Sequence, residues 1–552
     1  MPNGAQALMK TLVDAGVEVC FTNPGTSEMH FVAALDSEPN MRAVLALFEG
    51  VATGAADGYA RMADKPAATL LHLGCGLGNG LANLHNARKG KVPVVNIVGD
   101  HATYHVQYDA QLQSDIETVA RNVSPGFVRT SQSTEALCQD VADAITAARG
   151  LPGQVATLIL PADVSWGEGG KPCSVPSQPE APAADNTAVQ AAAEAVRSGK
   201  KTALLLGGQA LREPSLVAAA RIAAHNGVTL FAETFPTRIE RGAGLPPVER
   251  IAYLAELATL QLSEFDHLIL VDAKAPVSFF GYPGKKSYLV PDTCQVHTLS
   301  TPDQDAAASL NKLAEALGAT GVQPALQQAN RPGLPKGKLT AEKVCRAVGE
   351  LMPENSIIVD EAITSGLMLN AMTAGAPKHD LITLTGGAIG QGLPNAVGAA
   401  IACPDRPVLA LIGDGTAMYT IQALWTMARE KLNVTSIIFN NASYSILNVE
   451  LERVGADEAG AKARSQLDIS GPVTNFAQLA QSMGVHGIRV STAEELIKAM
   501  AYAQAHPGPH LIEAVVPESL NGVKRKILPW LLRTLPSLPR PLTKALKKKI
   551  AP

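Results

Sequence analysis

The sequence predicts an α/β protein made of three doubly wound, parallel-sheet domains. Short apolar runs rich in β-branched residues alternate along most of the chain with stretches of helical spacing, which is the pattern of repeated βαβ units. The 552 residues suffice for three domains of about 150 to 200 residues each. With 46% hydrophobic and 17% charged residues, the composition is typical of a globular chain rather than a disordered one.

Stretches rich in Pro, Gly, Ser and Ala divide the chain. The first domain is expected over residues 1–170. It begins with an amphipathic helix and has strands at 17–21, 67–73, 93–98 and 156–160. The middle domain is expected over 187–320, with strands at 202–206, 228–231 and 267–271. A third domain over 339–517 precedes a C-terminal tail, 518–552.

Cysteine usage and the N-terminus indicate a reducing, cytoplasmic location. The seven cysteines are scattered and none forms a C-x-x-C pair, so neither a zinc site nor a disulfide framework is indicated. The N-terminal stretch lacks the apolar block and cleavage site of a signal peptide, and no apolar run is long enough to span a membrane. The net charge of −4 favours no class of partner, and we expect no nucleic-acid partner.

One βαβ unit, Val408 to Tyr444, organises the rest of the chain. It contains two apolar runs that are each followed directly by polar residues, with helical spacing between them: 408–412, 434–439 and 418–429. Because the carboxyl ends of parallel strands meet at one edge of a sheet, Asp414 and Asn441 are expected to converge.

The residue types at these strand ends fit a magnesium ion and a diphosphate. A carboxylate, an amide oxygen and a backbone carbonyl are hard ligands that suit Mg²⁺, which takes its remaining ligands from water and phosphates. Gly413 and Gly415 allow the chain to approach phosphates closely, and the helix after Thr416 would direct its N-terminal amides at them.

A second candidate group is Glu49, which follows the apolar stretch 45–48 and precedes small residues. A carboxyl group in such surroundings is costly to ionise, which suits proton exchange. A glutamate at a helix start is also favoured by the helix dipole alone, so Glu49 by itself does not decide between the two interpretations.

Two glycine-rich stretches are weaker signals. GGQAL, after the first strand of the middle domain, lacks the full G-x-G-x-x-G spacing, so a plain turn is favoured over a nucleotide site. GCGLGNG, at 74–80, has Asn79 where a dinucleotide fingerprint needs glycine, and we interpret it as a close-approach loop.

Two of these motifs together resemble the signature of thiamine diphosphate (ThDP) enzymes: GDG followed by NN at this spacing, and the run from Glu49 to Ala60. Nearly the whole chain to about Val516 is similar to the ThDP-dependent decarboxylase and carboligase superfamily. The segments NPGTSE, LHLGCGLGN and GDGTAMYTIQALW are similar to benzoylformate decarboxylase. The resemblance implies pyrimidine-binding, middle and diphosphate-binding domains, in that order.

The resemblance assigns a metal site and a cofactor site. Asp414, Asn441 and the carbonyl of Ser443 would hold Mg²⁺. Glu49 would hydrogen-bond the aminopyrimidine ring and promote the imino tautomer that deprotonates the thiazolium carbon.

In GGAIGQGLP, Gly387 would lie at the cofactor and Ile389 would be the apolar wedge that bends it. On the substrate side, Thr26 occupies the position of the family's active-site serine and His72 that of an active-site histidine. A hydroxyl and an imidazole could hold a carboxylate and then move protons. The family's second histidine belongs near 278–284, where this chain has none, so protonation to a free aldehyde is in question.

The expected activity is ThDP- and Mg²⁺-dependent decarboxylation of a small 2-oxo acid, with aldehyde release or carboligation. The alternatives are an acetolactate synthase-like enzyme, a membrane-associated flavin-containing oxidase with bound FAD, which is not favoured, and a non-catalytic subunit with this fold. YDAQLQSD faintly resembles the Phe-Gln-Glu segment of acetolactate synthases, which makes Gln113 a pocket candidate. Their tryptophan is lacking after NNASY, where Leu447 and Glu450 are expected to line the substrate pocket instead.

The resemblance implies a homodimer or homotetramer that shares each cofactor between two chains. From Asn521 onward the tail carries nine Lys and Arg residues and no acid, interleaved with Trp530 and several leucines. This composition is typical of a peripheral anchor on an anionic membrane, and a lid over the active site or a basic tail are the alternatives.

Overall fold

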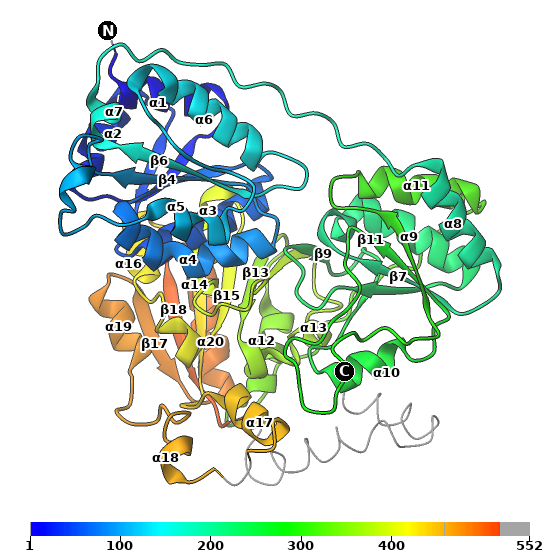
Figure 1. Ribbon diagram of the computed structural model, residues 1–552. Coiled ribbons are helices and arrows are strands. Elements are labelled where there is room, and N and C mark those ends of the chain that lie inside the picture. The colour runs from blue at the N-terminus through cyan, green and yellow to red at the C-terminus, as the bar shows by residue number, and fades with distance from the viewer. Residues whose placement is uncertain (1, 457–458, 519–552) are drawn as a thin grey trace.

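The computed structural model describes residues 2–456 and 459–518, and it arranges them around three sheets (Figure 1). The predicted fold class, three α/β units with parallel sheets, is confirmed. The first unit lies against the third, and the middle unit lies to the side of both (Figure 1). The basic tail lies outside the described residues.

The first sheet has six parallel strands in the order β2-β1-β3-β4-β6-β5. Its strands are β1 (Val19–Asn23), β2 (Arg42–Leu45), β3 (Ala67–Leu71), β4 (Val94–Asp100), β5 (Val128–Thr130) and β6 (Val155–Pro161). Its helices are α1 (Gly4–Asp14), α2 (Met29–Ala34), α3 (Glu49–Ala63), α4 (Leu73–Lys89), α5 (Ile116–Val123), α6 (Thr134–Ala148) and α7 (Ala162–Trp166). Helices α1, α2 and α6 cover one face, and α3, α4 and α5 cover the other. The central strands are therefore buried on both faces, which explains their continuous apolar runs.

The middle sheet has five strands in the order β10-β8-β7-β11-β12. Its strands are β7 (Thr202–Leu206), β8 (Thr229–Ala232), β10 (Glu249–Arg250), β11 (His267–Val271) and β12 (Gln295–Ser300). Its helices are α8 (Asn186–Arg197), α9 (Glu213–Asn226), α10 (Ala255–Leu262) and α11 (Ala306–Ala316).

The third sheet has seven strands in the order β17-β18-β16-β15-β13-β14-β9. Its strands are β13 (Ile357–Glu361), β14 (His379–Thr383), β15 (Val408–Gly413), β16 (Val434–Asn440), β17 (His486–Val490), β18 (His510–Val515) and an edge strand, β9 (Ile239–Arg241). Its helices are α12 (Ala341–Leu351), α13 (Leu369–Met372), α14 (Gly392–Ala402), α15 (Asp414–Ala417), α16 (Ala423–Arg429), α17 (Ser445–Arg453), α18 (Ala461–Arg464), α19 (Phe476–Ser482) and α20 (Ala493–Ala505). Strand β9 belongs to the middle stretch of the sequence and pairs antiparallel with β14, so it joins the two units.

Two local predictions were wrong. The helix expected over 418–429 begins only at Ala423, because the chain turns after α15 and Thr420 Oγ1 donates to the Gly390 carbonyl at 2.9 Å. The expected loop at 74–80 is the first part of α4. Its glycines do allow a close approach, because a Cβ at Gly80 would lie 2.8 Å from the Thr53 side chain on α3. In both cases a tertiary contact overrides the local signal.

Candidate functional site

The carboxyl ends of β15 and β16 bring Asp414 and Asn441 together. The two strands pair in parallel with Gly413 opposite Phe439, so the polar residues that follow lie side by side. Asp414 Oδ2 accepts hydrogen bonds from the backbone N–H groups of Asn441, at 2.9 Å, and Ala442, at 2.6 Å. Convergence of these two residues was predicted from the strand pattern.

The surroundings of Asp414 fit a hard cation beside a diphosphate. The side chain is buried, and burial raises the pKa of its carboxyl group above the usual range, although backbone N–H groups bonded to it act in the opposite direction. A bound cation would offset that burial cost. Asn441 Oδ1 lies at 2.9 Å from the Ser443 N–H, so the amide oxygen and the Ser443 backbone are adjacent. These are oxygen donors of the kind that Mg²⁺ prefers.

Gly415 lets the Tyr444 ring pack directly against the turn, because a Cβ there would lie 2.3 Å from that ring. Thr416 Oγ1 donates to the Gly413 carbonyl at 2.8 Å and fixes the turn between β15 and α15. Within the described residues, no group of three or more His, Cys, Asp or Glu side chains could hold a metal ion. A site with one carboxylate and two neutral oxygens is compatible with that finding.

Glu49 is the first residue of α3, and its side chain is buried. Asn79 on α4 donates from Nδ2 to Glu49 Oε2 at 3.0 Å. A Cβ at Gly76 would lie 3.0 Å from Glu49 Oε1, so this glycine of α4 makes room for the carboxylate. Asn79 was noted in the sequence only as a departure from a dinucleotide fingerprint.

Ile389 lies on a loop of the third unit between β14 and α14 and is half-buried. Gly387 and Gly390 flank it with φ values of +76° and +95°, which only glycine adopts easily. Asn83 on α4 donates from Nδ2 to the carbonyls of both Gly50, at 2.7 Å, and Gly390, at 3.2 Å. The loop that carries Ile389 is therefore tied to the start of α3.

Comparison with known proteins agrees with this geometry. Residues 2–120 match the description "Thiamine pyrophosphate enzyme, N-terminal TPP binding domain", and residues 365–514 match "Thiamine pyrophosphate enzyme, C-terminal TPP binding domain". A Mycobacterium tuberculosis protein with the provisional name acetolactate synthase large subunit IlvX is 56% identical, over 94% of this chain and 100% of that protein. The chain belongs to the thiamine pyrophosphate enzyme family. Thiamine pyrophosphate is another name for ThDP, so the expected family is confirmed.

Other ThDP enzymes are more distant. The benzoylformate decarboxylase of Pseudomonas aeruginosa is 27% identical, over 90% of this chain and 96% of that enzyme. The solved structure of a ThDP-dependent 4-hydroxybenzoylformate decarboxylase from Rhodococcus jostii RHA1 superposes with a TM-score of 0.82 at 22% identity, and covers 94% of this chain and 100% of that one. The similarity to this solved structure, at 22% identity, concerns the fold alone.

In this ThDP enzyme, His72 is held by a buried glutamate that the sequence reading did not single out. His72 Nδ1 lies 2.8 Å from Glu28 Oε2, and Glu28 is 1% exposed. The same oxygen accepts the Gly25 N–H at 2.7 Å, and a Cβ at Gly25 would lie 2.3 Å from the imidazole. Glu28 at the third position of a short helix, reaching back to the Gly25 N–H, is the glutamate half of a capping box, and this spacing in NPGTSE could have identified it.

Thr26 is exposed, whereas the neighbouring Ser27 hydroxyl lies 3.4 Å from His72 Nδ1 and donates to Glu28 Oε1 at 2.7 Å. Ser27 is thus a hydroxyl beside the imidazole that was not among the predicted site residues. Gln113 lies beside the same region, because the adjacent Ser114 hydroxyl would be 1.9 Å from a Cβ at Gly74, two residues after His72.

The two predicted substrate-pocket residues on α17, Leu447 and Glu450, have different surroundings. Leu447 is 43% exposed and free to contact a ligand. Glu450 accepts hydrogen bonds from the Tyr282 hydroxyl, at 2.8 Å, and from Arg453 Nη1, at 2.8 Å. Its charge is paired in a contact between α17 and the middle unit, so it need not repel a 2-oxo acid.

The segment that lacks the second histidine carries an aromatic cluster instead. Phe279 packs against Phe235, Tyr253 and Phe280 with ring centroids 5.0 to 5.7 Å away. A Cβ at Gly387 would lie 2.5 Å from the Phe279 ring, so the cluster touches the loop of Ile389.

The paired glycines of the middle unit do not present free amides to a phosphate. The N–H of Gly208 donates to Glu233 Oε1 at 3.1 Å, and that of Gln209 donates to Asp272 Oδ2 at 2.8 Å. Lys91 of the first unit pairs with Asp272 at 3.1 Å. Burial raises the pKa of Glu233 to about 7. The chain's own carboxylates thus occupy the position that a nucleotide phosphate would take at this switch point.

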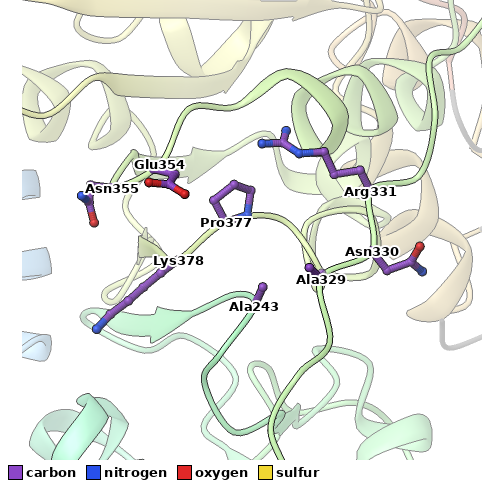
Figure 2. A pocket seen from close by; sticks show the side chains of 9 residues that line it. Ala243, Ala329, Asn330, Arg331, Glu354, Asn355, Pro377 and Lys378 are labelled. Carbon is purple, nitrogen blue, oxygen red and sulfur yellow. The ribbon is translucent and has the colours of Figure 1, made fainter.

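A cavity of about 490 Å³ has none of the candidate site residues in its lining (Figure 2). Its lining includes Glu354 and Asn355, which precede β13, and Pro377 and Lys378, which precede β14. It therefore opens at the amino ends of these strands, whereas Asp414 and Asn441 follow the carboxyl ends of theirs.

Proposed function

We propose that this ThDP enzyme uses Mg²⁺, decarboxylates a small 2-oxo acid, and then either releases an aldehyde or transfers the remaining unit to a second carbonyl compound. The observation that carries the proposal is the joint presence of Glu49 at the start of α3 and of Asp414 with Asn441 at the ends of β15 and β16. These are the groups expected at the two ends of one cofactor molecule.

Bound ThDP would supply the nucleophilic carbon and the electron sink for loss of carbon dioxide. Asp414, Asn441 and Ser443 would hold Mg²⁺, and Gly413, Gly415 and Thr416 would lie against the diphosphate. Glu49 would exchange a proton with the ring at the other end. Its carboxylate is oriented for this by Asn79.

His72 would move protons at the substrate. Its Nδ1 faces Glu28, so Nε2 is the nitrogen that can hold or deliver a proton. Gln113 and Leu447 would line the same pocket, and Thr26 would lie at its edge.

Transfer to a second carbonyl, as in an acetolactate synthase, is supported by the name of the 56% identical relative. It is also supported by the aromatic cluster around Phe279, which supplies no histidine where the decarboxylases of the family have one. A benzoylformate-like substrate with aldehyde release is the second candidate, supported by the local motifs and by the Pseudomonas aeruginosa relative.

The test is a screen of 2-oxo acids for carbon dioxide release, with ThDP and Mg²⁺, in the presence and absence of an aldehyde or 2-oxo acid acceptor. We expect release that requires both cofactors, and formation of a hydroxyketone when the acceptor is present. Accumulation of free aldehyde at an unchanged rate would favour the second candidate. A protein that binds ThDP but releases no carbon dioxide from any 2-oxo acid would be the non-catalytic alternative.

The active unit is proposed to be a homodimer, within a homotetramer, in which Glu49 of one chain and Asp414 of the other chain bind the same cofactor molecule. Within one chain, Asn83 already joins Gly50, the neighbour of Glu49, to Gly390. An experiment therefore has to decide whether the Glu49 and Asp414 of one site belong to the same chain or to two chains. Mixing Glu49→Gln chains with Asp414→Ala chains should restore up to about a quarter of wild-type turnover if random mixing gives one intact site in half of the dimers. Verified mixed dimers without restored turnover would mean that each site is built within one chain.

A flavin requirement is not favoured, because Glu233 and Asp272 use the amides of the middle-unit turn. We expect purified, fully active protein to be colourless, with no absorbance near the flavin bands. A yellow protein with stoichiometric FAD would contradict this expectation.

A cytoplasmic location, with membrane association through the tail, remains a prediction from composition. None of the described helices is long and apolar enough to cross a bilayer.

A further inference from the structure

The loop that carries Ile389 is held from two sides. On one side, Asn86 on α4 accepts the Ala388 N–H at Oδ1, at 3.2 Å, and donates from Nδ2 to the Ala388 carbonyl at 2.8 Å. On the other side, the loop runs directly into α14, whose first turn lies over the carboxyl end of β13.

The group at that end of β13 is Glu361, which is 2% exposed. Its Oε1 accepts the N–H groups of Gly390, at 2.7 Å, and Gln391, at 3.1 Å. Its Oε2 accepts the N–H of Gly392 at 2.7 Å. A carboxylate can satisfy three converging N–H donors because it has acceptor sites on both oxygens, and the positive end of α14 favours its charge. Burial nevertheless raises the pKa of Glu361 to about 7.

The fit around this carboxylate leaves little freedom. A Cβ at Gly392 would lie 2.8 Å from Glu361 Oε2 and 2.3 Å from the Ile412 side chain, so a larger residue there would displace one or both of these side chains. The position of Ile389, one residue before Gly390, is thereby coupled to one buried side chain.

We propose that Glu361 is a positioning residue for the cofactor: by fixing the N–H groups of Gly390, Gln391 and Gly392, it holds the loop that presents Ile389 to the ring end of ThDP. The inference rests on the proposed function of Ile389 and of the Asp414 site. It predicts an effect on the ring end of the cofactor that spares the diphosphate end, because the side chain of Glu361 holds the loop, whereas its contact with Thr416 at the proposed diphosphate site is made by its backbone carbonyl, at 3.5 Å.

Glu361→Gln separates this role from simple packing. A glutamine has the same size, but one end of its amide is a donor, so at least one of the three N–H groups would face another N–H. The variant keeps the volume of the core and changes only the hydrogen bonds under the loop.

The measurement is calorimetric titration of the full-length protein with ThDP and, separately, with inorganic diphosphate, both in excess Mg²⁺. We expect Glu361→Gln to raise the Kd for ThDP by about tenfold, the effect of losing one buried hydrogen bond to a charged group, and to leave the Kd for diphosphate within about twofold. As a control, Asp305→Asn removes a carboxylate that caps α11 in the middle unit, where Asp305 accepts the Ala308 N–H at 2.9 Å. That variant should leave both constants within about twofold of wild type, because α11 is not part of the proposed site.

If Glu361→Gln raised the Kd for ThDP and for diphosphate equally, the glutamate would support the domain as a whole, and the proposal would be overturned. If neither Kd changed, the glutamate would have no effect on the cofactor, which would also overturn it. Circular dichroism and thermal unfolding check that the variant is folded. If it does not fold, Glu361→Asp keeps the charge with a shorter reach, and the same selective loss for ThDP is expected. Wild-type protein that fails to bind ThDP would contradict the proposed function instead.

Discussion

Replacing Glu49 by Gln is expected to lower kcat by about 10²- to 10⁴-fold while the Kd for ThDP stays within about threefold of wild type. The amide can still hydrogen-bond the cofactor ring and Asn79, which now donates to Glu49 Oε2 at 3.0 Å, but it cannot take up a proton. The loss should therefore appear in the rate and not in binding. Turnover is measured as carbon dioxide release at saturating ThDP and Mg²⁺.

Glu135→Gln provides a matched control, because Glu135 is an exposed acid in the first turn of another helix of the same unit, α6. Its turnover should equal that of wild type. If Glu49→Gln also turned over at the wild-type rate, Glu49 would be only a favourable residue at a helix start. The proton-exchange role would then have to be abandoned.

The parts of the fold and site that follow from local patterns could be predicted from the sequence. Strands such as β7 and β11 were placed at their observed bounds because they are short, fully buried apolar runs. Asp414 and Asn441 were paired because parallel strands end at one edge, and the register of β15 with β16 brings them together. In these cases the chemistry lies within a few residues of a strand end.

The parts that depend on long-range contacts could not be predicted. Glu361 looks like any acid at a strand end until the N–H groups of residues 390–392 converge on it. Glu28 acquires a role only because β1 and β3 are neighbours, which places His72 beside it. The exchange of β9 into the third sheet also has no local signal, since a three-residue strand carries too short a pattern.

The crossing of α3 and α14 is another such contact, and it gives the largest expected effect on stability. A Cβ at Gly398 would lie 1.9 Å from the Ala55 carbonyl oxygen and 2.4 Å from the Tyr59 nitrogen. A Cβ at Gly58 would lie 2.3 Å from the Asn395 carbonyl oxygen. Because these neighbours are backbone atoms, no rotamer change relieves the overlap, and the helices would have to separate.

Separation of the two helices would also disturb a buried polar network. Asp57 pairs with Arg61 at 2.8 Å, with both side chains fully buried, and Gln391 Nε2 donates to Asp57 Oδ2 at 2.9 Å. Overpacking typically costs about 1 to 3 kcal/mol, and breaking a buried charge pair about 3 to 5 kcal/mol. Gly398→Ala is therefore expected to destabilise the protein by several kcal/mol, by these same order-of-magnitude estimates.

The measurement is the onset temperature of unfolding together with the rate of limited proteolysis, because a chain of several domains has no single two-state free energy. Gly78→Ala is the matched control: it makes the same change within helix α4, where a Cβ would meet nothing within 4 Å. That control should be neutral or more stable by up to about 1 kcal/mol, since alanine is the better helix former. A Gly398→Ala protein that unfolds and resists protease like wild type would mean that α3 and α14 do not cross as closely as the structure has them.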